Sequence, residues 1–260
     1  MTILAIGKNA FLASAIINDP DKDHWHFMDH QSAMSGEAWS QDIETVVNFA
    51  YDPVIQKGEF SELDRLLAKK AQEVEAQYIM LSSRAVYGVP PKPFELIESA
   101  NPYKKMTPYG HAKRLIEDDL LERFDHVTIL RLSNIFGDEY QAHRERQTFF
   151  GTMLKSLKEE GGINFSMSAL TQRDFLPLNN FSQWLGIIAN NPVPGIFNLG
   201  AGFGTACGDI AYWLMEGYGD GRLNNTEDDV IDSFVLDMAK TRGTYTLPPI
   251  YMREIRESCM

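Results

Sequence analysis

Near its start the chain reads Ile3-Leu4-Ala5-Ile6-Gly7-Lys8-Asn9-Ala10-Phe11-Leu12-Ala13. An apolar run that stops at a glycine and continues with apolar residues at helical spacing predicts a buried strand, a tight turn and a helix. We place the strand at residues 3–6 and the helix at about residues 10–18, closed by Asp19-Pro20. A strand, turn and helix in this order is the unit from which parallel α/β sheets are built.

The same stretch has the spacing of a dinucleotide-binding turn in which alanines replace the second and third glycines. Gly7 permits the tight turn, and the start of the helix presents backbone N–H groups to a pyrophosphate. Ala13 is tolerable where helix and strand pack closely, whereas the methyl group of Ala10 would stand where backbone should approach the phosphates. An ordinary strand-turn-helix without a ligand is the alternative. The motif predicts that a dinucleotide contacts Gly7, Asn9, Ala10, Phe11 and Leu12.

Further strands and helices alternate along the chain. Apolar runs predict strands at residues 25–28, 45–49, 78–81, 127–132 and 195–199, and helices are expected at 59–76, 109–124, 149–158 and 181–189. This alternation predicts an α/β fold, a doubly wound parallel sheet (Rossmann-like) with a small C-terminal substrate lobe. We expect residues 1–136 to form the dinucleotide-binding core, with 171–200 returning to it. Residues 137–170 and 201–260 would form the lobe.

Composition narrows the classes of function. The 260 residues are 44% hydrophobic and 23% charged, as in ordinary globular proteins. A net charge of −12 disfavours a nucleic-acid-binding protein, whose partner demands a basic surface. No apolar run is long enough to span a membrane, and no basic leader precedes the first strand. The two cysteines, Cys207 and Cys259, lie far apart, which favours a reducing, cytoplasmic location.

Asp29 lies 22 residues after Gly7, at the end of the second expected strand. A carboxylate there can accept hydrogen bonds from a ribose 2′-OH and would repel a 2′-phosphate. NAD is therefore favoured over NADP, although Lys8 partly offsets this preference. A turn residue that closes the strand is the alternative role.

No metal site is expected. The cysteines have no metal-binding spacing. Three histidines, His24, His26 and His30, surround the second strand, but a strand points successive side chains to opposite faces.

Serine, tyrosine and lysine supply the parts of a proton-transfer site. Ser82 and Ser83 follow an expected strand, and functional residues of parallel sheets collect at the carboxyl ends of strands. Tyr109 and Lys113 are one helical turn apart and share a helix face. An ammonium beside a phenol favours the phenolate, which suits a tyrosine that exchanges protons. A loop or cap role is the alternative for the serines, and no Gly-x-Ser-x-Gly hydrolase motif occurs.

These motifs, taken in order, resemble the extended short-chain dehydrogenases/reductases of the NAD-dependent epimerase/dehydratase family, which acts on nucleotide-linked sugars. The resemblance spans residues 1 to about 205. It rests on Ser82-Ser83-Arg84-Ala85-Val86-Tyr87-Gly88, Pro108-Tyr109-Gly110-His111-Ala112-Lys113, Arg131-Leu132-Ser133-Asn134-Ile135-Phe136-Gly137, Arg173-Asp174-Phe175-Leu176-Pro177-Leu178 and Gly195-Ile196-Phe197-Asn198-Leu199-Gly200.

The resemblance implies roles for these residues. Tyr109 would be the general acid or base, Lys113 would hold the nicotinamide ribose, and Ser83 would donate to the substrate oxygen. Phe49 and Ala50, in the segment 47–50, would lie near the adenosine half of the cofactor. The resemblance also implies substrate-binding residues: Ser83 and its neighbour Arg84, Asn134 at the nucleotide-sugar, Arg173 at its diphosphate and, more weakly, Arg242, for which a surface arginine is the alternative.

The chain also departs from the family pattern. Arg84 and Ala85 stand where the dehydratases of the family carry an Asp-Glu pair, so 4,6-dehydration is disfavoured. The interval between Asp29 and Val47 is short, which predicts that one strand-helix unit is missing or abbreviated. Together with Ala10, these departures suggest a trimmed reductase more than a full-length epimerase.

The sequence therefore predicts an NAD(P)-dependent oxidoreductase that acts on a nucleotide-linked sugar. Reduction of a 4-keto sugar by hydride transfer, with Tyr109 as proton donor, is the first hypothesis. A sugar epimerase that reuses bound NAD is the second, and a non-catalytic NAD(P)-binding regulatory protein of the same fold is the third. The resemblance allows a homodimer through the helices at residues 59–76 and 109–124.

Overall fold

Six parallel strands form the central sheet of the computed structural model, which describes residues 2–18, 22–35, 39–40, 42–90, 94–103, 105–137, 148–229 and 231–260. The order across the sheet is β10-β6-β4-β3-β1-β2, and every neighbouring pair is parallel. The strands are β1 (Thr2–Ile6), β2 (Trp25–Met28), β3 (Ile43–Asn48), β4 (Gln77–Ser83), β6 (Val127–Leu132) and β10 (Gly195–Leu199). The predicted parallel α/β sheet is confirmed.

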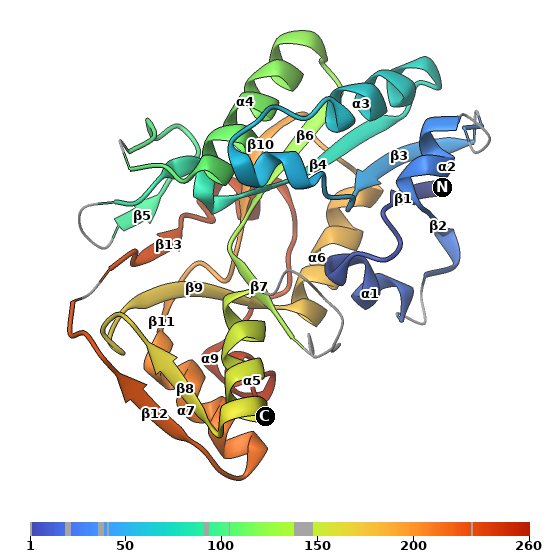
Figure 1. Ribbon diagram of the computed structural model, residues 1–260. Helices are drawn as coiled ribbons and strands as arrows, with labels where there is room; N and C mark the ends of the chain where they lie inside the picture. Colours follow the sequence, from blue (N-terminus) through green and yellow to red (C-terminus); the bar gives the residue numbers. More distant parts are fainter. Residues whose placement is uncertain are drawn as a thin grey trace.

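Alternating side chains give the sheet two buried faces. In β1, Ile3 and Ala5 join one hydrophobic cluster, while Leu4 and Ile6 join the other. Helices α1 (Phe11–Ile17) and α6 (Leu178–Asn190) cover the first face. Helices α3 (Leu63–Glu73) and α4 (Pro108–Arg123) cover the second. Figure 1 shows the two pairs on opposite sides of the sheet.

Helix α3 starts later than the sequence predicts, at Leu63 rather than residue 59. The hydroxyl of Ser61 accepts a hydrogen bond from the backbone N–H of Leu63 and so begins the helix there. The preceding residues follow a short 3-10 helix, Pro53–Lys57, which ends at Gly58 with φ 84°. The closing residues expected for α1, Asp19-Pro20, lie outside the described part of the chain.

Among the described residues, only β2 lies beyond β1 in the sheet, whereas the doubly wound order 3-2-1-4-5-6 places two strands there. The chain passes from β2 through the short helix α2 (His30–Ser35) directly to β3, on the other side of β1. The expected abbreviation between Asp29 and Val47 is therefore the loss of one strand at this edge.

A second sheet assembles segments from distant parts of the sequence. Its order is β11-β9-β13-β5, and β7 also pairs with β9. These strands are β5 (Phe94–Leu96), β7 (Asn134–Phe136), β9 (Gln172–Pro177), β11 (Gly204–Ala206) and β13 (Phe234–Leu236). Strands β5 and β7 come from the predicted core segment and β11 and β13 from the predicted lobe segment, so this sheet joins the two.

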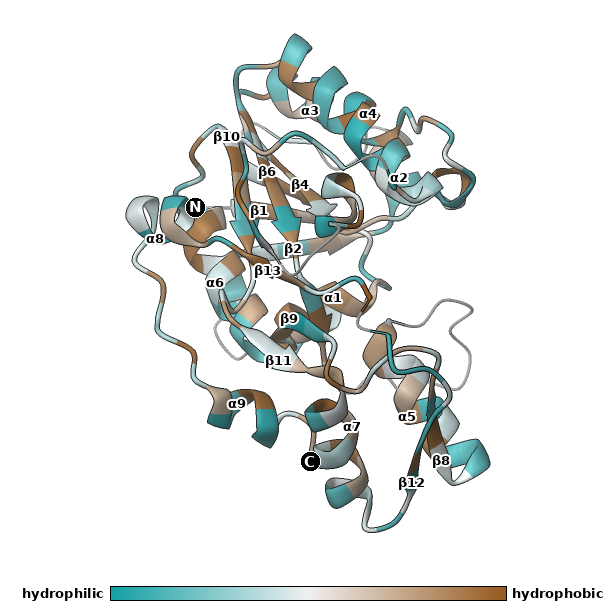
Figure 2. Cartoon of the chain, turned by 90° about the vertical axis from the view of Figure 1, so that its left-hand side faces the viewer, coloured by the Kyte–Doolittle hydropathy of each residue, from teal (hydrophilic) through white to brown (hydrophobic). Residues whose placement is uncertain are grey.

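Most of the remaining elements lie apart from the parallel sheet (Figures 1 and 2). Strands β8 (Gly162–Phe165) and β12 (Arg222–Asn225) pair with each other and pack with α5 (Phe149–Glu160) and α7 (Cys207–Tyr218). Helix α9 (Met252–Glu257) lies beside β9, whereas α8 (Ala239–Thr244) packs against β10 of the central sheet. The division into core and lobe stays a prediction, and its segment 137–170 includes residues 138–147, which are not described.

No described helix combines the length and the apolar character that crossing a bilayer requires.

Candidate active site

A cavity of about 580 Å³ lies above the carboxyl ends of β1, β3, β4 and β6. This is the edge of an open parallel sheet at which ligands bind. Its volume is within the usual range for small-molecule sites. The wall consists of Asn9, Ala10, Phe11, Leu12, Asn48, Phe49, Ala50, Tyr51, Leu81, Ser82, Ser83, Tyr109, Lys113, Leu132, Ser133, Asn134, Ile135, Thr148 and Phe149.

The turn after β1 requires the first glycine of the dinucleotide-binding motif, Gly7, but does not require a glycine at the second motif position, which Ala10 occupies. Gly7 has φ 99°, and a Cβ there would lie 2.5 Å from the backbone nitrogen of Ala50. Ala10 has φ −71° and ψ 147°, an ordinary extended conformation, and it packs against the hydrophobic cluster under α1. The backbone of the turn therefore accepts alanine at position 10. Ala13 is fully buried between helix and sheet, as the close packing predicted.

A buried polar network supports the end of β3. The side-chain oxygen of Asn48 accepts a hydrogen bond from the N–H of Ala50, while its Nδ2 donates to Asp64 at 2.8 Å. Tyr78 donates its hydroxyl to the same carboxylate at 2.7 Å. Burial raises the pKa of Tyr78 well above its ordinary value, so this hydroxyl stays a donor. The loop with Phe49 is held in place beside the turn after β1.

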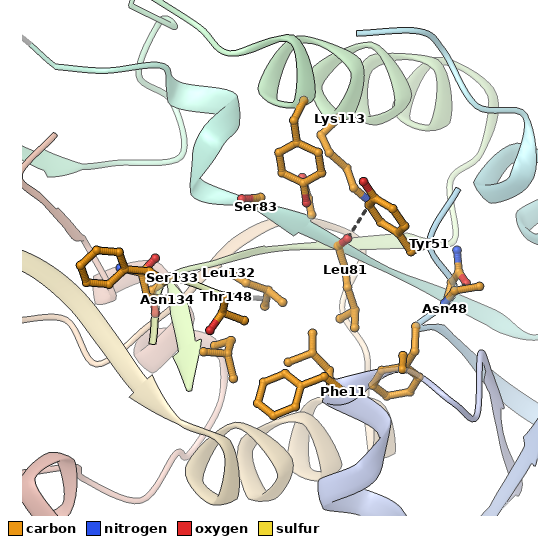
Figure 3. A pocket seen from close by; sticks show the side chains of 18 of the residues that line it. Phe11, Asn48, Tyr51, Leu81, Ser83, Lys113, Leu132, Ser133, Asn134 and Thr148 are labelled. Carbon is orange, nitrogen blue, oxygen red and sulfur yellow. Dashed lines mark hydrogen bonds between the residues drawn. The ribbon is translucent and has the colours of Figure 1, made fainter. Parts of the chain in front are cut away.

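Helix α4 brings Tyr109 and Lys113 to the cavity. Thr107 caps the helix by accepting a hydrogen bond from the N–H of Gly110, and Pro108 occupies its first turn. A Cβ on Gly110 would lie 2.2 Å from the carbonyl oxygen of Ala85, so only glycine allows this close approach. The buried Lys113 donates from Nζ to the carbonyl oxygen of Leu81 at 3.0 Å (Figure 3).

The two serines at the end of β4 have different environments. Ser82 is buried and donates its hydroxyl to Glu117 at 2.6 Å. Ser83 is partly exposed, and its Oγ accepts a hydrogen bond from the N–H of Ala85 at 3.2 Å. The hydroxyl proton of Ser83 is therefore not used in that bond. Both residues border the cavity, but Ser83 is the one that can donate to a ligand oxygen.

Asn134 and Thr148 lie toward the opposite end of the cavity from Asn48 and Tyr51, with Ser83 and Lys113 between them in the view of Figure 3. The Nδ2 group of Asn134 is buried and has no hydrogen-bond partner among the described residues. A buried amide donor without a partner is costly unless a ligand or water satisfies it. This end of the cavity therefore offers a donor to a polar ligand group.

The structure thus gathers ten of the predicted site residues around one cavity. These are Asn9, Ala10, Phe11, Leu12, Phe49, Ala50, Ser83, Tyr109, Lys113 and Asn134. Gly7 lies directly beneath, in the turn. The other four predicted residues, Asp29, Arg84, Arg173 and Arg242, are outside the wall of the cavity.

Asp29 follows β2, as predicted, and caps helix α2. Its carboxylate accepts hydrogen bonds from the N–H of Ser32 at 2.9 Å and from the Ser32 hydroxyl at 3.2 Å. The N–H of Ser32 is the main cause that lowers the pKa of Asp29. Lys8 lies 3.7 Å away, which is the partial offset expected from the sequence. A ribose that reached this carboxylate would share it with these groups.

The three predicted arginines are each held by other groups. Arg84 makes a bidentate pair with Asp232 and stacks on Phe234, 4.2 Å from the ring centroid. Arg173 stands 3.6 Å from the same carboxylate. It stacks at 4.7 Å on Phe149, which does border the cavity.

Arg242 donates from Nη2 to the carbonyl oxygen of Ala201 at 2.8 Å. Its guanidinium is used within the fold, on the side of α8.

Sequence reasoning missed part of the wall. Asn48 lies in the predicted segment 47–50 but was not named as a site residue, and the rule that strand ends carry the site would also have included Tyr51. Leu81, Leu132 and Ser133 follow from the same rule. No comparable signal identifies Thr148 and Phe149, because they reach the cavity from the start of α5 rather than from a strand of the central sheet.

Comparisons with known proteins agree with this architecture. The sequence model described as the NAD dependent epimerase/dehydratase family matches residues 61–200. No curated protein matches the chain in sequence. The solved UDP-N-acetylglucosamine 4-epimerase from Methanobrevibacter ruminantium M1 is similar in fold, with 14% identity and a TM-score of 0.79 over 99% of this chain and 96% of that one.

Two further solved structures are similar in fold. The dTDP-glucose 4,6-dehydratase from Bacillus anthracis str. Ames, in complex with NAD, is 15% identical, with a TM-score of 0.79 over 100% of this chain and 95% of that one. The UDP-glucose 4-epimerase from Thermotoga maritima, with UDP-glucose, is 16% identical, with a TM-score of 0.78 over 100% and 97%. At such low identities the likeness is one of fold.

Proposed function

The chain belongs to the NAD dependent epimerase/dehydratase family, as its motifs predicted, and we propose that it reduces the keto group of a nucleotide-linked sugar. One observation carries the proposal. A single cavity wall joins the first turn of α1, where a dinucleotide would begin, to Ser83, Tyr109 and Lys113, where a carbonyl would be reduced. A 4-keto sugar is the preferred substrate class.

The residues present fit NAD. The turn after β1 accepts Ala10 without strain, because its backbone angles suit any residue and its side chain packs against the core. Asn9, Ala10, Phe11 and Leu12 would hold the pyrophosphate, and the Phe49–Tyr51 loop would border the adenosine half. The buried Lys113 would hold the ribose beside the nicotinamide. When bound, the cofactor supplies the hydride that the ketone carbon receives.

Two side chains of the protein would transfer the proton to the ketone oxygen and stabilise the negative charge that develops there. Ser83 donates a hydrogen bond to the ketone oxygen and stabilises it as it becomes an alkoxide. Tyr109 transfers its phenolic proton to the same oxygen, which leaves a phenolate. Lys113 lies one turn along the same helix face. Solvent then returns a proton to Tyr109.

A 4-epimerase is the second candidate, because the same side chains can run the step in both directions on a nucleotide-sugar. The fold similarity to two solved 4-epimerases favours it. Dehydration is disfavoured, because Arg84 follows Ser83 and is paired with Asp232. No carboxylic acid directly follows Ser83 to protonate a leaving hydroxyl.

The test compares Tyr109→Phe with Tyr212→Phe, a change at an exposed tyrosine of α7. NADH oxidation is followed with a nucleoside-diphosphate 4-keto-6-deoxyhexose, and epimerisation is followed with UDP-glucose and NAD. We expect Tyr109→Phe to lower kcat at least about 100-fold, with unchanged thermal unfolding, and Tyr212→Phe to keep wild-type activity. Full activity of Tyr109→Phe would exclude the mechanism.

The two assays separate the candidate functions. Turnover of UDP-glucose without net NADH oxidation would replace the reductase by the epimerase. Micromolar NAD binding with no turnover in either assay would support the non-catalytic regulatory alternative.

A further inference from the structure

Helix α4 carries a third polar side chain in line with Tyr109 and Lys113. Glu117 is one further turn along and is fully buried. It pairs with Arg131 of β6, also fully buried, and accepts hydrogen bonds from its Nε at 3.2 Å and its Nη2 at 2.7 Å. The face of α4 that brings two residues to the cavity thus continues into an ion pair inside the protein.

Arg131 itself is fixed from several sides. Its Nη1 donates to the carbonyl oxygen of Glu98 at 3.0 Å, and its guanidinium lies 4.7 Å from the ring centroid of Tyr87. The Tyr87 hydroxyl donates to Asn198 of β10 at 2.7 Å. The partner of Glu117 is therefore tied to three neighbouring segments and has little freedom to move.

Two bonds attach successive turns of α4 to successive residues of β4. Lys113 donates to the carbonyl oxygen of Leu81, and Ser82 donates its hydroxyl to Glu117. The next residue along the strand is Ser83, and the preceding turn of the helix carries Tyr109. Any slide of α4 along β4 would break both bonds and would separate Tyr109 from Ser83.

Stability alone is a weak reason for such a pair. An apolar pair of similar volume is often as stabilising as a buried ion pair or more so, because two charges lose their water. Ala112, Ile116 and Leu120 already anchor α4 by apolar contacts. Those contacts are non-directional, whereas charge-assisted hydrogen bonds require a fixed geometry. The ion pair therefore contributes more to the exact position of α4 than to the stability of the fold.

We propose that Glu117, held by Arg131 and bonded to Ser82, is a positioning residue that sets the height of α4 against the end of β4 and so aligns Tyr109 with Ser83. This inference rests on the proposed function, because alignment matters only if the two hydroxyl groups meet one substrate oxygen. Misplacement by about 1 Å can cost about 100-fold in rate. The turn after β1, the Phe49–Tyr51 loop and Asn134 would contact cofactor and substrate independently of α4.

Two single variants each delete one hydroxyl hydrogen bond, at different distances from the cavity. Ser82→Ala deletes the hydroxyl bond to Glu117, and Thr128→Val deletes a part-buried hydroxyl bond of 2.8 Å from Thr128, at the start of β6, to the carbonyl oxygen of Val193. We expect Ser82→Ala to lower kcat at least about tenfold with KM within about threefold. Thr128→Val should keep the wild-type kcat. Equal kcat values in both variants would overturn the proposal.

A double variant removes the ion pair without leaving an unpaired charge. Glu117→Leu combined with Arg131→Met should retain the fold. Its kcat should fall at least about tenfold with KM little changed. Wild-type kcat in the folded double variant would likewise overturn the proposal.

Hydrogen exchange tests the alignment without any substrate. In Ser82→Ala the backbone amides of residues 109–114 should exchange about tenfold faster than in the wild type, whereas in Thr128→Val they should not change. If the wild type turns over none of the sugar nucleotides, only the proposed function is excluded. The hydrogen-exchange comparison would still test the positioning role. Identical exchange in all three proteins would refute the positioning role.

Discussion

Two arginine clusters of this protein differ in how their charges balance. The core ion pair, Arg131 with Glu117, has one charge of each sign, and both side chains are 0% exposed. The seam cluster, Arg84 and Arg173 with Asp232, has two positive charges and one negative, with side chains 12–19% exposed. The charges of the core ion pair cancel, whereas the three residues of the seam cluster carry a net charge of one positive unit.

The two clusters also differ in their location relative to the cavity. The core ion pair lies behind the cavity, between α4 and β6. The seam cluster joins the segment after β4 to β9 and to the residues before β13, and Arg173 stacks on Phe149 of the cavity wall. A saturated pair can hold position, whereas a cluster with surplus positive charge beside a ligand cavity can attract an anion. Asp232 would then compete with the phosphates of a ligand.

The largest expected difference between the clusters is in stability. Glu117→Gln leaves Arg131 buried without a counter-charge, which should cost about 3–5 kcal/mol of unfolding free energy. Asp232→Asn acts at a partly exposed site and should cost about 1 kcal/mol or less. Urea unfolding of both variants measures the contrast. Equal losses of unfolding free energy would show that the two clusters contribute to stability in the same way.

The fully buried carboxylate of Asp174 sharpens the comparison, because no lysine, arginine or histidine pairs with it among the described residues. It accepts backbone hydrogen bonds from Ala201, Gly202 and Leu236. Burial nevertheless raises the pKa of Asp174 from 3.8 to about 6. Its protonated form is therefore favoured more in the folded state than in the unfolded state. The stability that this gives is present below pH 4 and is lost as the pH rises through about 6.

Asp174→Asn should remove this pH dependence. A shift of this size corresponds to about 3 kcal/mol. The difference in unfolding free energy between wild type and Asp174→Asn should therefore change by about 2 kcal/mol between pH 4 and pH 7.5, to the disadvantage of the wild type at the higher pH. Urea unfolding at the two pH values measures it. A constant difference would mean that Asp174 is ionised at both.

The smallest expected effect is on ligand affinity. Removing the charge of Asp232 should strengthen the binding of UDP about threefold at low salt, since both arginines lose their competing carboxylate. Titration calorimetry of wild type and Asp232→Asn with UDP at low and at 200 mM salt checks this, and salt should reduce the gain. Weaker binding in Asp232→Asn would assign the seam cluster a purely structural role.

Local chemistry made much of the fold predictable. Strands β6 and β10 have the bounds that their apolar runs predicted, and α4 starts at Pro108 after the capping residue Thr107. The short interval before Val47 predicted the missing edge strand. In each case the signal lies within a few residues of the element that it describes.

Pairings between distant segments were beyond such reasoning. Arg84 was expected at the substrate, but its guanidinium is bound by Asp232, 148 residues along the chain. The second sheet joins β5 to β13 across a similar interval. Residue patterns carry no sign of such partners, because either segment alone looks like an ordinary loop or short strand.

The order of residues by itself determined that a parallel sheet would form, that Ser83 would stand at its carboxyl edge and that Tyr109 and Lys113 would share one helix face. Helical and strand periods are local properties, and parallel strands end at one edge whatever else the chain does. Only the tertiary structure decided that Ser82 bonds to Glu117 while Ser83 keeps its proton for a ligand, and that Phe149 completes the cavity wall. Those outcomes depend on which buried charge meets which partner, and folding settles that by bringing distant segments together.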